Sequence, residues 1–142
     1  MPEYKGSLSS KLPQVKTSIF SVMSALSNQE GAINLSQGFP DFAVDPHLIE
    51  LVNKYMRAGL NQYASMPGLL SLREAISNKV EKSYSLKYNP ETEVTVTSGA
   101  TQAIYSAISA VVKEGDEVIL FTPAYDCYAP TIELNGGTPI YI

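Results

Sequence analysis

The stretch that decides the fold is residues 93–142, EVTVTSGATQAIYSAISAVVKEGDEVILFTPAYDCYAPTIELNGGTPIYI. Its pattern predicts short strands at 93–99, 117–122 and 138–142, separated by helices at about 101–112 and 125–135. The middle strand is apolar without alternation, which is typical of a strand covered on both faces in a parallel sheet. The resulting β-α-β-α-β order predicts an α/β fold.

Helical periodicity dominates the residues that precede this stretch. One amphipathic helix is predicted around residues 19–26, a second from Pro46 to just before Gly59, and a third at about 69–84. Asp45 is placed to cap the second helix, while Ser71 and Glu74 have capping-box spacing in the third. The loops between these helices cover 34–46, with Phe39 and Phe42 as anchors, and 61–68.

Composition narrows the classes of function. The 142 residues carry a net charge of −4 and no basic run, which argues against nucleic acid and anionic membranes as partners. A single cysteine excludes an internal disulfide framework, and one histidine without a cysteine pair makes a metal site a poor interpretation. No signal peptide or membrane-spanning run is recognisable, so a cytoplasmic protein is expected.

The junction TSGAT at residues 97–101 is the first candidate binding site. A strand ending at a helix start would aim backbone N–H groups and the positive end of the helix dipole at a phosphate. Gly99 permits close approach of the backbone, with Ala100 and Thr101 following it. The competing interpretation is an ordinary helix cap, which is common for serine and threonine.

Tyr125 follows the predicted strand at 117–122, at the sheet edge where ligands bind in open α/β folds. Its ring could cover a flat cofactor, or it could be a core tyrosine. Gly38 could present its N–H to a substrate carboxylate or only make a turn, and Tyr63 could offer a hydroxyl to a phosphate or only pack. His47 and Cys127 are interpreted as solvated and half-buried side chains without a chemical role.

Taken together, four blocks of the sequence resemble the fold-type I, class I aminotransferases, in the branch of methionine aminotransferases and kynurenine/glutamine transaminases. The blocks are NLSQGFPDF (34–42), NQYASMPGLLSLREAI (61–76), VTVTSGATQAIY (94–105) and GDEVILFTPAYDCYAP (115–130). They occur in the order and at the spacing of that family, over nearly the whole chain.

The resemblance implies pyridoxal 5'-phosphate as the cofactor and amino acids and 2-oxo acids as substrates. Residues around Gly99, Ala100 and Thr101 would hold the cofactor phosphate, Tyr125 would stack on its ring, and Gly38 would meet the substrate carboxylate. Tyr63 would reach the phosphate of the other subunit, so a homodimer is expected.

The same resemblance implies a division of the chain and a missing residue. Residues 1–44 would form an arm and small-domain segment, and residues 45–142 would begin a large cofactor-binding domain. The lysine that forms the Schiff base would lie beyond Ile142, so no catalytic residue is assigned and the chain should be inactive and marginally stable alone. A carbon–sulfur β-lyase of the same fold, or a non-catalytic truncated module, are the alternatives.

Overall fold

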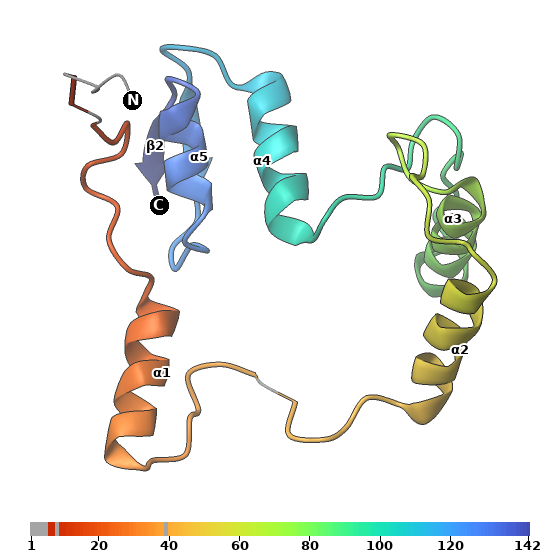
Figure 1. Ribbon diagram of the computed structural model, residues 1–142. Helices are drawn as coiled ribbons and strands as arrows, with labels where there is room; N and C mark the ends of the chain where they lie inside the picture. Colours follow the sequence, from red (N-terminus) through yellow and green to blue (C-terminus); the bar gives the residue numbers. More distant parts are fainter. Residues whose placement is uncertain (1–5, 8, 39) are drawn as a thin grey trace. The chain divides into compact units, whose positions relative to one another are not determined.

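The computed structural model describes residues 6–7, 9–38 and 40–142 (Figure 1). Phe39, one of the two predicted loop anchors, lies outside the described residues. The elements in chain order are α1 (Ile19–Glu30), α2 (Pro46–Arg57), α3 (Leu70–Tyr84), α4 (Ala100–Val111), β1 (Glu117–Leu120), α5 (Tyr128–Leu134) and β2 (Thr138–Tyr141). They form two compact units, one made of residues 1–38 and 99–142 and the other of residues 39–98.

The first unit contains a parallel β1–β2 pair joined through α5. Glu117 aligns with Thr138, and the register continues to Leu120 opposite Tyr141. Ile132 of α5 is fully buried and Leu120 is nearly so, which places the small core of this unit between the helix and the strands. The α/β fold class and both of these strands are therefore confirmed.

Helices α4 and α5 of the first unit pack against each other. The Asn135 side-chain amide donates to Ser109 Oγ at 3.1 Å, which joins the C-terminal ends of the two helices. A Cβ on Gly137 would lie 2.7 Å from Val112 Cγ1, so the residue that follows α4 lies close to the residue that precedes β2. It follows that the N-terminal ends of α4 and α5 lie at the opposite end of this unit (Figure 1).

Three predictions for residues 93–142 are wrong. Residues 93–99 form no strand, because the N–H of Val96 bonds to the Pro67 carbonyl at 2.9 Å and no strand ladder develops. The middle strand is not covered on both faces, since Ile119 remains 61% exposed. The apolar residues of the helix at about 101–112 also predict that it packs between the sheet and another layer, but among the described elements α4 contacts only α5 and Val111 is largely exposed.

The second unit contains α2 and α3, which begin in different ways. Asp45 Oδ1 accepts the His47 N–H at 2.8 Å, which confirms the predicted cap of α2. Helix α3 begins at Leu70, after an N-cap residue that makes no side-chain hydrogen bond. Ser71 therefore lies inside the helix, and the predicted capping box is wrong.

Within the part of the chain that the structure describes, no helix is both long and apolar enough to cross a membrane. No group of three or more metal-ligating side chains is found among the same residues. The division of the chain at residue 44 stays a prediction.

Candidate functional site

The start of α4 has the features expected of an anion site. Gly99 is the N-cap residue, with φ 89° and ψ 168°, a conformation that is essentially restricted to glycine. As a glycine, residue 99 provides no side-chain cap of its own, and a Cβ built on it would have no neighbour within 4 Å. The N–H groups of Ala100 and Thr101 have no partner inside the helix, since the first four N–H groups of any α-helix lack one. The position thus combines donors, a positive dipole end and open space.

Tyr125 lies in the loop between β1 and α5. Its ring centroid is 6.0 Å from that of Phe20 in α1 and 5.9 Å from that of Tyr128, so part of the ring is packed in an aromatic cluster. The side chain nevertheless stays 46% exposed. Both interpretations of this residue thus describe part of its surroundings: the ring is anchored, and about half of its surface remains available.

Gly99 and Tyr125 belong to the same end of the first unit. The C-terminal ends of α4 and α5 are joined at Ser109 and Asn135, and the loop that follows β1 leads into the N-terminal end of α5. Figure 1 shows the first residues of α4 and the 121–127 loop at this shared end, which is also where the parallel strands end. This is the end of an open α/β sheet at which ligands bind.

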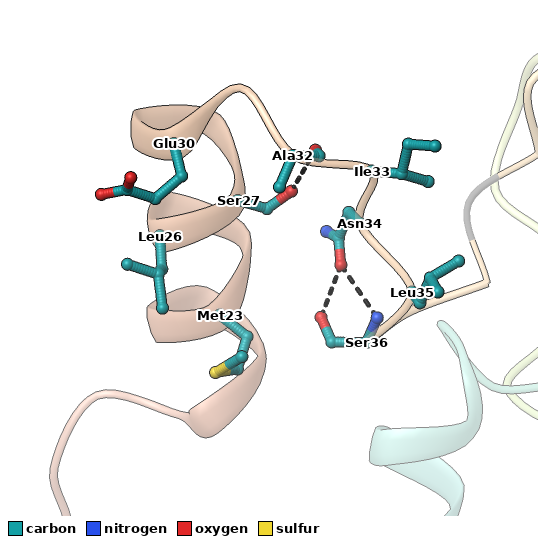
Figure 2. Close-up of a pocket in the computed structure, with 9 residues that line it drawn as sticks. All are labelled: Met23, Leu26, Ser27, Glu30, Ala32, Ile33, Asn34, Leu35 and Ser36. Atoms are coloured by element: carbon teal, nitrogen blue, oxygen red, sulfur yellow. Dashed lines mark hydrogen bonds between the residues drawn. The ribbon is translucent and has the colours of Figure 1, made fainter.

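Gly38 follows a loop that folds back on α1. Ser27 Oγ donates to the Ala32 carbonyl at 2.7 Å (Figure 2). The Asn34 side-chain amide donates to Ser24 Oγ at 3.2 Å. Asn34 Oδ1 in turn accepts the N–H and the hydroxyl of Ser36 at 3.0 and 2.6 Å. Because these bonds shape the loop, the backbone approaching Gly38 has a defined course.

An open groove of about 360 Å³ lies between α1 and this loop (Figure 2). Its lining is mainly apolar, with Met23 and Leu26 from the helix and Ile33 and Leu35 from the loop. Gly38 itself is exposed and does not line the groove, and a Cβ there would meet nothing within 4 Å.

Tyr63 belongs to the second unit. Its side chain is fully exposed, at 102% of the reference area, in the loop before α3. The interpretation of Tyr63 as a packed side chain within this chain is therefore wrong. A ring that contacts so little of its own chain is available to a partner.

Arg73 is a buried residue that the sequence analysis missed. It is 7% exposed. Its guanidinium donates to the main-chain carbonyls of Gly68, which precedes α3 in the sequence, and of Pro90, which follows it. The i, i+4, i+8 spacing of Leu72, Ile76 and Val80 predicts an apolar stripe along α3, but Leu72 is exposed and Arg73 is buried. A signal was present, because Arg73 and Ser77 are four residues apart and so share one face of the helix.

His47 and Cys127 are as predicted, one exposed and the other half-buried. Burial, and secondly the negative charge of Asp126, raise the pKa of the Cys127 thiol. A thiol with a raised pKa is mostly protonated near neutral pH and is a weak nucleophile. Neither residue adds a reactive group to the site.

Comparison with known proteins shows the family to which this α/β chain belongs. The family Aminotransferase class I and II matches residues 30–142, so the chain belongs to that family. Its members depend on pyridoxal 5'-phosphate.

Individual relatives give the same result. The chain is 54% identical over 128 residues to methionine aminotransferase of Escherichia coli K12, covering 90% of this chain and 33% of the relative. It is 39% identical over 118 residues to human kynurenine–oxoglutarate transaminase 3, covering 82% of this chain and 26% of the relative. The chain thus spans about a third of the length of the curated relatives it matches.

Solved structures extend the likeness to three dimensions. The crystal structure of YbdL from Escherichia coli, described as having a methionine aminotransferase function, superposes with a TM-score of 0.89 at 51% identity. It matches 96% of this chain and 36% of that one. N-succinyldiaminopimelate aminotransferase from Mycobacterium tuberculosis gives 0.86 at 39% identity, over 96% of this chain and 35% of its own.

Proposed function

We propose that the protein is an aminotransferase that moves an amino group from an amino acid to a 2-oxo acid by means of pyridoxal phosphate. The observation that carries the proposal is the start of α4, where a glycine N-cap with φ 89° leaves open space beside the positive end of the helix dipole. The match of residues 30–142 to the aminotransferase family supports it. A methionine or aromatic amino donor is favoured by the relatives described above.

The backbone at Gly99, Ala100 and Thr101 would hold the cofactor phosphate. Peptide N–H groups at a helix terminus donate to phosphate oxygens, and the dipole adds about 0.3–1 kcal/mol for a nearby anion. Glycine at position 99 is required because a side chain there would be strained and would occupy the open space.

Tyr125 would cover one face of the cofactor ring. Offset stacking contributes about 0.5–1.5 kcal/mol beyond the burial of area. The contacts of Tyr125 with Phe20 and Tyr128 would orient the ring, so that little side-chain freedom is lost on binding.

Gly38 and Tyr63 would act on the substrate and on the partner subunit. The N–H of Gly38 would donate to the substrate carboxylate, which the absence of a side chain allows to approach closely. The exposed Tyr63 would donate its hydroxyl to the phosphate bound by the other subunit of a homodimer.

The bound cofactor supplies an electron sink for the carbanion formed at the amino acid. Residues 1–142 would hold and orient this group, and none of them is assigned the role of the covalently binding lysine. We place the protein in the cytoplasm, because its single cysteine suits a reducing compartment.

The test measures the transfer of a labelled amino group from the donor to the 2-oxo acid. The intact protein that carries residues 1–142 is supplied with cofactor, a 2-oxo acid and nitrogen-labelled methionine or phenylalanine. We expect the label to appear in the new amino acid in a one-to-one ratio with the consumed donor. Release of the label as free ammonium together with a thiol would instead indicate a β-lyase. The isolated 142-residue chain serves as the control and should transfer nothing.

A further inference from the structure

Tyr63 lies in the loop at residues 61–68, and its side chain makes no packing contact with the described residues that would hold it in place. The ring is fully exposed, so packing of the ring does not fix its position. The loop has no regular secondary structure of its own. Where the hydroxyl of Tyr63 points therefore depends on what holds the main chain of this loop.

The end of the loop is held by hydrogen bonds to its main chain. Gly68 N–H donates to the Ser65 carbonyl at 2.8 Å, and Ser65 Oγ donates back to the Gly68 carbonyl at 2.7 Å. The Val96 N–H donates to the Pro67 carbonyl at 2.9 Å. These bonds close a tight turn two residues after Tyr63.

Arg73 ties this turn to a second segment of the chain. Its Nε donates to the Gly68 carbonyl at 3.1 Å, and its Nη1 donates to the carbonyls of Pro90 at 2.5 Å and Glu91 at 3.3 Å. Hydrogen bonds from a buried charged donor are stronger than neutral ones, and the planar guanidinium fixes their directions. A single side chain thus holds the turn at Gly68 and the turn at residues 90–91 in one arrangement.

We propose that Arg73 is a positioning residue for cofactor binding, acting through the Gly68 carbonyl to aim Tyr63 at the phosphate. This inference rests on the proposed function, specifically on the role of Tyr63. Arg73 itself touches neither cofactor nor substrate in this scheme. A lysine would keep the charge at this position, but its single ammonium cannot reproduce the fork that joins Gly68 to Pro90.

The test is a double-mutant cycle on the intact protein, read as the dissociation constant of pyridoxal phosphate. Arg73→Lys should weaken cofactor binding about tenfold when Tyr63 is present and much less in the Tyr63→Phe background. A residue that only stabilises the fold would weaken binding equally in both backgrounds. Equal weakening, or none in either background, overturns the proposal.

The controls separate this inference from the proposed function. Arg57→Lys changes an exposed arginine of the same unit and should leave the dissociation constant unchanged in both backgrounds. If Tyr63→Phe alone has no effect on cofactor binding, the role assigned to Tyr63 is wrong and the inference fails with it. If Tyr63→Phe weakens binding but Arg73→Lys adds independently, only the inference fails.

A milder variant keeps the test decisive if Arg73→Lys does not fold. Ser65→Ala removes a second hydrogen bond to the same Gly68 carbonyl from an exposed position. It should weaken cofactor binding about threefold and again only when Tyr63 is present. Ser71→Ala, on the exposed side of α3, is the matched control and should change nothing. Additive effects of Ser65→Ala and Tyr63→Phe would contradict the proposal.

Discussion

The starts of α3 and α4 each contain a glycine with positive φ, but the surroundings of the two glycines differ. Gly68 precedes the first helix with φ 100°, and Gly99 caps the second with φ 89°. A Cβ on Gly68 would lie 2.7 Å from Val96 Cβ, whereas a Cβ on Gly99 would meet nothing within 4 Å. A glycine with positive φ therefore meets packed atoms in one place and open space in the other. Filled space at Gly68 indicates a structural role, and the binding role proposed for Gly99 requires the open space found there.

The largest effect on stability should follow from Gly68→Ala. Backbone strain of about 1–3 kcal/mol adds to a steric clash with Val96 of similar size, so we expect the free energy of unfolding to fall by about 3 kcal/mol. Urea denaturation of the intact protein measures this. Gly59→Ala has the same kind of strain at φ 77° but meets no atom, and should cost clearly less. If Gly68→Ala and Gly59→Ala reduced the free energy of unfolding equally, the distinction between glycines with filled and with open surroundings would be wrong.

Gly99→Ala should act mainly on binding. The alanine is strained at ψ 168° and its methyl group enters the proposed phosphate site, so we expect at least about tenfold weaker binding of pyridoxal phosphate. Titration of the intact protein with cofactor measures the change. Gly31→Ala, at a left-handed position with open space at the end of α1, provides the control. If both variants bind cofactor equally well, Gly99 is only a cap.

Asp45→Ala tests α2, a helix whose N-cap side chain accepts a hydrogen bond from the helix backbone. Loss of the bond from the His47 N–H to Asp45 Oδ1 should reduce the free energy of unfolding by about 1 kcal/mol. The affinity for cofactor should not change, because Asp45 caps α2 and is not among the residues proposed to bind the cofactor. Thermal melts and cofactor titrations of the same preparations test both statements, and a loss of affinity would count against them.

The smallest effect concerns Cys127, at the start of α5. A helix start usually lowers a thiol pKa, but here burial, followed by the charge of Asp126, raises it. A higher pKa means less thiolate near neutral pH, so alkylation by iodoacetamide should be slower than for a free cysteine. Asp126→Asn removes a negative charge, should lower the pKa, and should speed the reaction a few-fold at pH 7–8. A rate profile against pH that does not move would refute this.

Local signals in the sequence were enough to find most elements. Asp45 and Pro46 mark the start of α2, and the unbroken apolar residues near Ile119 mark β1, because these patterns depend on nearby residues. The parallel pairing of β1 with β2 also followed from the intervening helix. The candidate residues around Gly99 could be named for the same reason, since a strand-like segment before a helix start is a local feature.

The failures came from partners distant in sequence. Val94 to Thr97 alternate like a strand, yet the Val96 N–H is used by Pro67, almost thirty residues earlier. Arg73 was overlooked because a charged residue predicts an exposed position unless its partners are known, and those partners are carbonyls at Gly68, Pro90 and Glu91. No pattern in a single sequence gives the direction of a main-chain carbonyl.

The contact between Phe20 and Tyr125 joins residues separated by roughly a hundred positions. During translation at about 5–20 residues per second, α1 leaves the ribosome many seconds before the loop that receives it. Its apolar side stays without that neighbour while all of α2, α3 and α4 are made. Chaperones that bind nascent chains would therefore have early and prolonged access to the apolar side of α1.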